Sequence, residues 1–125
     1  VGARSSAGPR VACVTFPGEK HEIALLGLAV HFTLKGFRVT YLGTDMPAAE
    51  LGRFLAASPQ DWLAVSVIQR TPASAITSYC KQVLAMAPRG LGVVLGGAGL
   101  PDLGPKAPKG VTFAADWHDL EIDAR

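Results

Sequence analysis

Two side chains in the first third of the chain, Glu19 and His21, have the types and spacing to prepare a metal ligand. The neutral imidazole of His21 can ligate a metal through one ring nitrogen, and Glu19 can accept the proton on the other, which fixes the tautomer. Because zinc needs three or four protein ligands, a single histidine is a poor zinc site. We therefore expect that a metal held here would arrive inside a cofactor that fills its other positions. The alternative is a solvated charged turn whose histidine has no role.

Two later segments could contribute to the same ligand site. Ser66 ends an apolar run, where its hydroxyl could bond a ligand nitrogen, cap the strand or be satisfied by the backbone. Gly96 and Gly97 begin a Gly-Gly-Ala-Gly sequence, which permits positive φ and lets a bulky ligand touch the backbone. This cluster is not a dinucleotide fingerprint, which belongs after the first strand, and no Gly-Lys-Ser/Thr follows it as in a P-loop.

Several other chemistries lack their residues. A phosphoacceptor receiver domain needs an acidic cluster after its first strand and an Asp after its third, and a serine hydrolase needs a G-x-S-x-G elbow; the sequence has none of these. Cys13 and Cys80 do not have the close spacing of a zinc site or a redox pair. Cys13 lies in an apolar run, so we expect a buried, reduced thiol and a reducing compartment, the bacterial cytoplasm.

The composition predicts one compact domain. The chain has 125 residues, of which 49% are hydrophobic and 18% charged, which is incompatible with a disordered chain. The net charge of +2 comes from scattered Lys and Arg, so we expect ordinary solvation rather than direct contact with DNA. The longest apolar run, 23–30, is far short of the roughly 20 residues that a membrane span needs. Residues 1–9 have a linker composition, and the start at Val1 predicts that the domain, 10–125, comes from a longer protein.

Alternating apolar runs and helical periodicities predict a parallel α/β fold. Strands are expected at 11–16, 37–42, 62–68, 91–95 and 111–113, and helices at 22–35, 47–57, 72–87 and 117–124, with a short helix or none over the proline-rich stretch 100–110. Near-continuous apolar strands indicate a five-stranded sheet covered on both faces, a flavodoxin-like (Rossmann-like) three-layer sandwich with strand order 2-1-3-4-5. Ligands of such sheets bind at the carboxyl ends of the strands, where the loops discussed above would lie.

Taken together, the three loops resemble the cobalamin (vitamin B12)-binding domain, whose pattern is D/E-x-H-x-x-G, then S-x-L, then G-G. The corresponding segments here are Glu19 to Ala24, Ser66 to Ile68, and Gly96-Gly97, and the resemblance covers about residues 10–120. Two flanking segments, 17–22 and 41–47, are similar to the version found in MerR-type bacterial transcription regulators, which include light-responsive repressors. Enzymes of the family usually carry Asp where this chain has Glu19, which favours a sensor domain of a regulator over an enzyme.

The resemblance implies base-off, His-on binding of adenosylcobalamin or methylcobalamin. His21 would replace the dimethylbenzimidazole tail of the cofactor as the lower axial ligand of cobalt, and Glu19 would orient His21. Ser66 would bond the buried tail, Gly96 and Gly97 would leave room for it, and Thr71 would extend the Glu19–His21 pair through its hydroxyl. Ala24 in place of the glycine of the pattern adds a methyl group beside the tail and would weaken binding. The exchange of leucine for Ile68 conserves volume.

The same resemblance implies partners within a longer chain. Related regulators carry an upstream helical bundle that caps the upper face of the cofactor and a DNA-binding domain further upstream, so oligomers would form only in the full-length protein. We expect this domain to contact neither DNA nor a membrane. The alternatives are a corrinoid-carrier module of a methyltransferase or mutase, a related haem-binding sensor, and a cofactor-free interaction domain.

Overall fold

The computed structural model describes residues 8–101 and 110–114. Its elements follow in the order β1 (Arg10–Thr15), α2 (Glu22–Leu34), β2 (Arg38–Gly43), α3 (Ala48–Ala57), β3 (Trp62–Ser66), α4 (Ala73–Met86), β4 (Gly92–Gly96) and β5 (Val111–Ala114). The predicted helix at 117–124 lies outside the described residues, as do nearly all of the linker 1–9 and most of the stretch 100–110.

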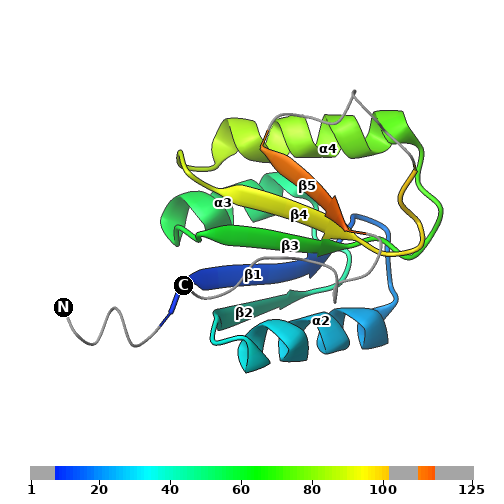
Figure 1. Ribbon diagram of the computed structural model, residues 1–125. Coiled ribbons are helices and arrows are strands. Elements are labelled where there is room, and N and C mark those ends of the chain that lie inside the picture. Colours follow the sequence, from blue (N-terminus) through cyan, green and yellow to red (C-terminus); the bar gives the residue numbers. More distant parts are fainter. Residues whose placement is uncertain (1–7, 102–109, 115–125) are drawn as a thin grey trace.

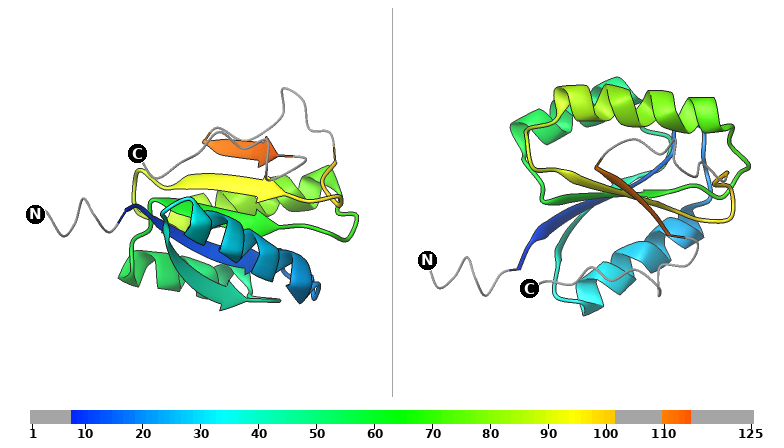
Figure 2. Two further views of the ribbon diagram at one scale, coloured as in Figure 1. Left: turned by 60° about the horizontal axis from the view of Figure 1, so that its bottom comes forward. Right: turned by 45° about the horizontal axis from the view of Figure 1, so that its top comes forward.

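The strands form one parallel sheet in the order β2-β1-β3-β4-β5, which confirms the predicted fold class and strand order. Helix α2 covers one face of this sheet, and α3 and α4 lie side by side on the other, as Figures 1 and 2 show. The fold is therefore a three-layer, Rossmann-like sandwich. Strand order reverses between β1 and β3, and the loops after these two strands meet at the same edge of the sheet.

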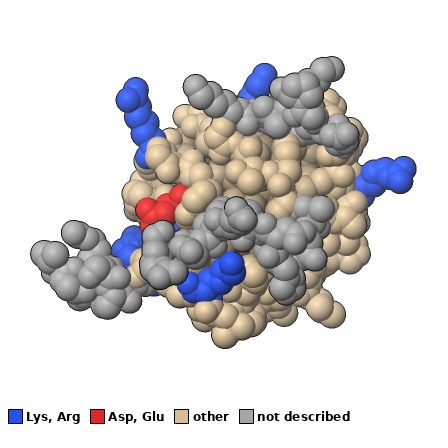
Figure 3. All heavy atoms as spheres, in the orientation of Figure 1, with Lys and Arg blue, Asp and Glu red and all other residues tan. Residues whose placement is uncertain are grey.

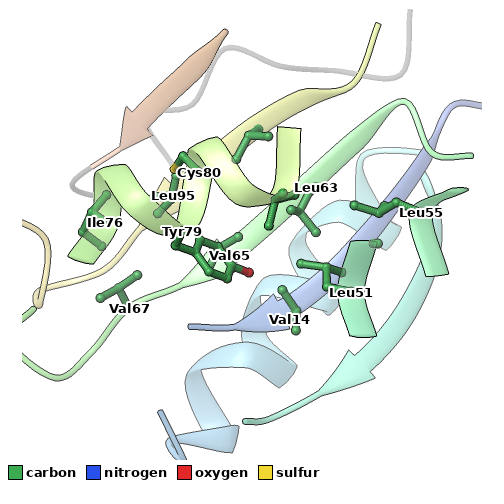
Figure 4. Packing of buried hydrophobic residues seen from close by; sticks show 13 residues of the cluster. Val14, Leu51, Leu55, Leu63, Val65, Val67, Ile76, Tyr79, Cys80 and Leu95 are labelled. Atoms are coloured by element: carbon green, nitrogen blue, oxygen red, sulfur yellow. The ribbon is translucent and has the colours of Figure 1, made fainter. Parts of the chain in front are cut away.

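The core has two parts, because successive side chains of a strand point to opposite faces. The larger part packs the strand residues Val14, Leu63 and Val65 against apolar residues of α3 and α4, among them Leu51 and Ile76 (Figure 4). The smaller part lies under α2, whose three buried side chains contact the alternate strand residues. These residues are Leu25, Leu28 and Phe32 from the helix and Val11, Cys13, Ala64 and Val94 from the strands.

Element boundaries agree with the prediction to within about two residues. Strand β3 ends at Ser66 rather than at 68, because the chain turns there toward the helix α4. Helices α3 and α4 begin one residue later than predicted: Pro47 and Pro72 precede them with extended backbone, at φ −62° and −63°. The residue at the cap position of α4 is Pro72, and it makes no side-chain cap.

Cys13 and Cys80 are free and buried, as predicted for Cys13. Burial raises the pKa of the Cys13 thiol to about 12 and that of Cys80 to about 11, so both are protonated at neutral pH. In the part of the chain that the structure describes, no helix is long and apolar enough to span a bilayer.

Candidate functional site

The loop between β1 and α2 is shaped by a tight turn before His21. Gly18 has a φ of +85°, which a glycine adopts without steric cost, and the N–H of Glu19 donates to the carbonyl of Phe16 at 2.9 Å. The N–H of Phe16 donates to the carbonyl of Ser66 at 3.0 Å, so the start of the loop remains attached to β3. His21 is the residue immediately before α2, and its side chain makes no helix cap.

The carboxylate of Glu19 is buried, with only 2% of the residue exposed. Its Oε1 atom accepts the backbone N–H groups of Ile68 at 2.7 Å and Gln69 at 2.6 Å. Its Oε2 atom accepts the backbone N–H of His21 at 3.2 Å and is also hydrogen-bonded to Nδ1 of the His21 ring. Glu19 therefore joins the loop after β1 to the loop after β3, with His21 on its other side.

The charge of this carboxylate decides which nitrogen of the neutral imidazole carries the proton. Burial alone would raise the pKa of Glu19, but hydrogen bonds from the Gln69 backbone, from His21 and from the Ile68 backbone outweigh it and lower the pKa from 4.5 to about 2. Glu19 is thus ionised at neutral pH and can only accept, so Nδ1 of His21 must carry the proton. When the ring is neutral, the lone pair of Nε2 is then available to a metal. The His21 side chain is 54% exposed, which keeps that nitrogen accessible.

A hollow of about 420 Å³ lies beside His21 and brings together three of the predicted site residues. His21, Ala24 and Ile68 line it, along with Lys20, Glu22 and Ile23. A larger hollow of about 530 Å³ lies at the opposite edge of the sheet, next to Asp61, Trp62 and Val111. We assign the site to the smaller one, because it contains the half-exposed imidazole of His21, which is paired with the buried carboxylate of Glu19.

Small side chains lie at the carboxyl ends of β1, β3, β4 and β5, on the sheet face that α2 covers. Strand register places Thr15 opposite Ser66, Ser66 opposite Gly96, and Gly96 opposite Ala114. Ser66 is 1% exposed, and its hydroxyl has no hydrogen-bond partner among the described residues. Since buried polar groups are nearly always paired, this hydroxyl is a candidate to hydrogen-bond a ligand.

Gly97 has a positive φ, as the glycine cluster permits, and its close approach to Val67 is a structural role that the sequence did not indicate. Its φ is +126°, and a Cβ there would lie 2.2 Å from the carbonyl oxygen of Val67. The N–H of Val67 donates to the carbonyl of Gly96, and the N–H of Gly99 donates to the carbonyl of Val67, both at 2.9 Å. The glycine cluster thus lets the loop after β4 support the backbone segment after β3 that holds Glu19. Its predicted role of leaving room for a cofactor tail stays a prediction for Gly96 and Gly97.

Thr71 reaches Glu19 only through the backbone of Gln69. Its hydroxyl donates to the carbonyl of Gln69 at 2.9 Å, and the N–H of Gln69 donates to Glu19. Gln69 could not be identified from the sequence, because its contact with Glu19 uses the backbone. It did offer a signal for Thr15 and Asp45, a polar residue at the end of an apolar strand and an Asp in a Gly-Thr-Asp turn, but we did not predict their part in the site.

No model of a known protein family matches the chain. Two proteins of Myxococcus xanthus are similar in sequence. The HTH-type transcriptional repressor CarH is 39% identical over 88 residues, and the HTH-type transcriptional repressor CarA is 38% identical over 94. The matched stretches cover 70% and 74% of this chain but 29% and 32% of the repressors. The chain therefore spans less than a third of the length of these relatives.

Solved structures with the same fold include three corrinoid or cobalamin proteins. The methanol:cobalamin methyltransferase complex MtaBC from Methanosarcina barkeri matches with a TM-score of 0.73 at 18% identity, over 85% of this chain and 41% of that one. The monomethylamine corrinoid protein of M. barkeri matches with a TM-score of 0.64 at 18% identity, over 74% of this chain and 45% of that one. A cobalamin-binding protein from Desulfitobacterium hafniense DCB-2 matches with a TM-score of 0.62 at 20% identity, over 75% and 46%.

These similarities confirm the resemblance that the three motifs predicted. The chain is similar to part of two transcriptional repressors, and it has the Rossmann-like fold of corrinoid proteins. The sequence relatives are repressors rather than enzymes, whereas MtaBC is a methyltransferase complex.

Proposed function

We propose that this chain is a cobalamin-binding sensor domain of a bacterial transcription regulator, with His21 as the lower axial ligand of cobalt in place of the cofactor's own base. One observation carries the proposal. The half-exposed His21 ring, held by the buried Glu19 carboxylate, lies at the same sheet edge as the buried Ser66 hydroxyl, which has no partner among the described residues. Similarity to two HTH-type repressors supports a role in a transcription regulator rather than in an enzyme.

The residues of the site fit this cofactor. The corrin macrocycle supplies four nitrogen ligands, so cobalt needs a single protein ligand, and His21 offers one accessible nitrogen. The hollow beside it is lined by apolar atoms of Ile23, Ala24 and Ile68. Bound cobalamin would supply a cobalt centre that can exchange its upper ligand in response to light or to another ligand. Such an exchange is the signal that a sensor requires.

Glu19 prepares His21 for ligation. Its ionised carboxylate accepts the Nδ1 proton, which fixes the tautomer and makes Nε2 a stronger donor. Because Ile68 and Gln69 hold the other carboxylate oxygen, the ring is oriented before any ligand arrives. In this proposal Thr71 supports the pair from a distance, by binding the carbonyl of Gln69.

The nucleotide tail of the cofactor would lie along the small residues of the sheet. Ser66 would donate to or accept from its base, and Gly96 would leave the neighbouring position free of a side chain. Ala24 narrows the hollow by one methyl group relative to the family pattern. Adenosylcobalamin and methylcobalamin share this lower face, so these residues accept either.

The regulator would be a longer protein. Since the chain spans less than a third of CarH and CarA, we propose that a helical bundle and a DNA-binding domain accompany it, and that those parts form the oligomer and contact the operator. The Lys and Arg side chains stand apart from one another on the face that Figure 3 shows, which supports a domain without direct DNA contact. No residue here is assigned a catalytic role, and the free cysteines are in keeping with a cytoplasmic location.

A corrinoid carrier for a methyltransferase is the second candidate. The match to MtaBC, with a TM-score of 0.73, favours it. The two candidates share the lower-face chemistry and differ in what the upper face meets. A methyltransferase domain or subunit encoded with the chain, and methyl transfer from the loaded domain, would establish the carrier.

Titration of the domain with hydroxocobalamin, followed by ultraviolet–visible absorption, tests the proposal. We expect saturable binding with a spectral change that His21→Ala abolishes. His31→Ala is the matched control, because it removes a histidine from α2, the helix that follows His21, and His31 does not line the hollow. Thermal melts of both variants report whether each is folded.

Three outcomes are distinct. Binding that depends on His21 supports the proposal, and an identical cobalt spectrum in His21→Ala contradicts His-on ligation. Absence of binding together with a Soret band after reconstitution with haem would make the domain a haem sensor.

A further inference from the structure

We propose that Thr15 and Asp45 are positioning residues that attach the loop after β2 to the loop after β1, residues 16–21, which we call the ligand loop. They thereby fix the orientation of Glu19 and His21 before a ligand binds. This inference rests on the proposed function, because it concerns the ligand that His21 would provide. It assigns a role to two residues outside the three motifs.

The hydroxyl of Thr15 connects the two loops. Thr15 is the last residue of β1 and is fully buried. Its Oγ1 atom donates to the backbone carbonyl of Glu19 at 2.9 Å and accepts the backbone N–H of Asp45 at 3.0 Å. A single hydroxyl thus uses its donor and an acceptor position to join residues four and thirty positions further along the chain.

Asp45 completes the connection from the other side. Its Oδ1 atom accepts the N–H of Gly18 at 2.7 Å. Among the described residues Asp45 is the only non-glycine residue with a positive φ, +58°, a conformation that Asp adopts more readily than most residues. The strained backbone aims the carboxylate back at the ligand loop, which explains why the turn needs this residue type.

The two contacts hold consecutive residues of the ligand loop. Asp45 binds the N–H of Gly18, and Thr15 binds the carbonyl of Glu19, two residues before His21. The carboxylate of Glu19 is held separately by backbone groups that follow β3. The backbone of Glu19 is therefore held by residues that follow or end β1 and β2, and its side chain by residues that follow β3. The position of His21, two residues further on, is defined before a ligand binds.

Loss of either contact should lower the affinity for hydroxocobalamin and the fraction of cofactor ligated by His21. We expect the affinity to fall about tenfold in Thr15→Val, which removes the hydroxyl at constant shape. We expect the same loss in Asp45→Gly, which keeps the positive φ and removes the carboxylate. Residues that support a metal ligand typically contribute about 10–100-fold in affinity, and this is the low end of that range. Thr15→Ser and Asp45→Asn keep the atoms that form these hydrogen bonds, so both variants should bind hydroxocobalamin as the parent does.

A double-mutant comparison separates positioning from a general effect on the fold. In a His21→Ala background, Thr15→Val and Asp45→Gly should leave the residual cobalamin affinity unchanged, because there is no ligand left to position. An equal loss with and without His21 would overturn the proposal, as would parent-like affinity and spectra in both single variants.

Nitrogen NMR of the cofactor-free domain gives a readout that does not depend on cobalamin. We expect the His21 ring to carry its proton on Nδ1 in the parent and to become a tautomer mixture in Thr15→Val and Asp45→Gly. That result in a domain that fails to bind cobalamin would retain the positioning role and refute the proposed function. An unchanged Nδ1–H tautomer in both variants would refute the positioning role.

Discussion

At the scale of the residue, the site depends on a carboxylate whose two oxygens have different tasks. Oε1 of Glu19 is bound to the backbone of Ile68 and Gln69, and Oε2 faces His21. An anchored acceptor orients an imidazole better than a freely rotating one, because the conformational entropy of the carboxylate has already been lost on folding. The charge of Glu19, sustained by these hydrogen bonds, decides which nitrogen of His21 is available.

Glu19→Gln tests this division of tasks. Glutamine keeps the shape and one carbonyl oxygen but loses the charge, so we expect His21 to ligate cobalt about 10–100-fold more weakly. Titration with hydroxocobalamin measures the loss. Glu50→Gln is the matched control, since Glu50 is an exposed carboxylate in the first turn of α3 and does not line the hollow beside His21. Equal affinities of the two variants would show that the charge of Glu19 has no special role.

At the scale of the element, the site requires three neighbouring strands to end at one edge. β1, β3 and β4 are adjacent, and the loops that follow them provide His21, the amides that bind Glu19, and the glycines that pack beneath those amides. The pattern of apolar runs predicted this convergence, since parallel strands must end together. It did not predict the amide contacts, because backbone N–H groups leave no side-chain signature in a sequence.

Gly97→Ala tests the support beneath the backbone segment after β3 that holds Glu19. The substitution forces a side chain into φ +126° and places Cβ 2.2 Å from the Val67 carbonyl, so we expect a loss of at least about 1–3 kcal/mol in the free energy of unfolding. Urea denaturation measures it. Gly27→Ala is the control: this glycine lies in α2 with nothing within 4 Å of the added Cβ, and helix propensity predicts a gain of about 0.5–1 kcal/mol. A Gly97→Ala domain as stable as the parent would contradict the packing described here.

At the scale of the whole molecule, the sequence was sufficient for the fold and only partly sufficient for the site. Strand order followed from the hydrophobic runs, the right-handed crossovers and the number of strands, which depend on whole segments rather than on single residues. Glu19, His21, Ala24 and Ile68 were predicted from motifs. The structure places the last three around one hollow, with the buried Glu19 hydrogen-bonded to His21 and to the backbone of Ile68. Thr15 and Asp45 escaped prediction because their contacts bridge thirty residues and depend on one strained φ angle.

Stability against acid should follow the ionisation of Glu19. Its pKa is about 2 when folded and 4.5 in its ordinary state, so the unfolded chain binds this proton first as pH falls. The contribution of Glu19 is fully present above the ordinary pKa and is lost as the pH falls from about 4.5 to about 2. Urea denaturation over a pH series measures the effect. The difference in free energy between the parent and Glu19→Gln should be constant near neutral pH and shrink over that range; a difference independent of pH would contradict the assignment.

Electron paramagnetic resonance of cob(II)alamin bound to the domain labelled with ¹⁵N-histidine shows directly whether His21 ligates cobalt. An axial nitrogen splits each cobalt line into a triplet when it is ¹⁴N and into a doublet when it is ¹⁵N. If His21 is the lower ligand, labelling converts triplets to doublets, and His21→Ala removes the doublets. Triplets that persist in the labelled protein would mean that the cofactor's own base still ligates cobalt, and His-on binding would be wrong.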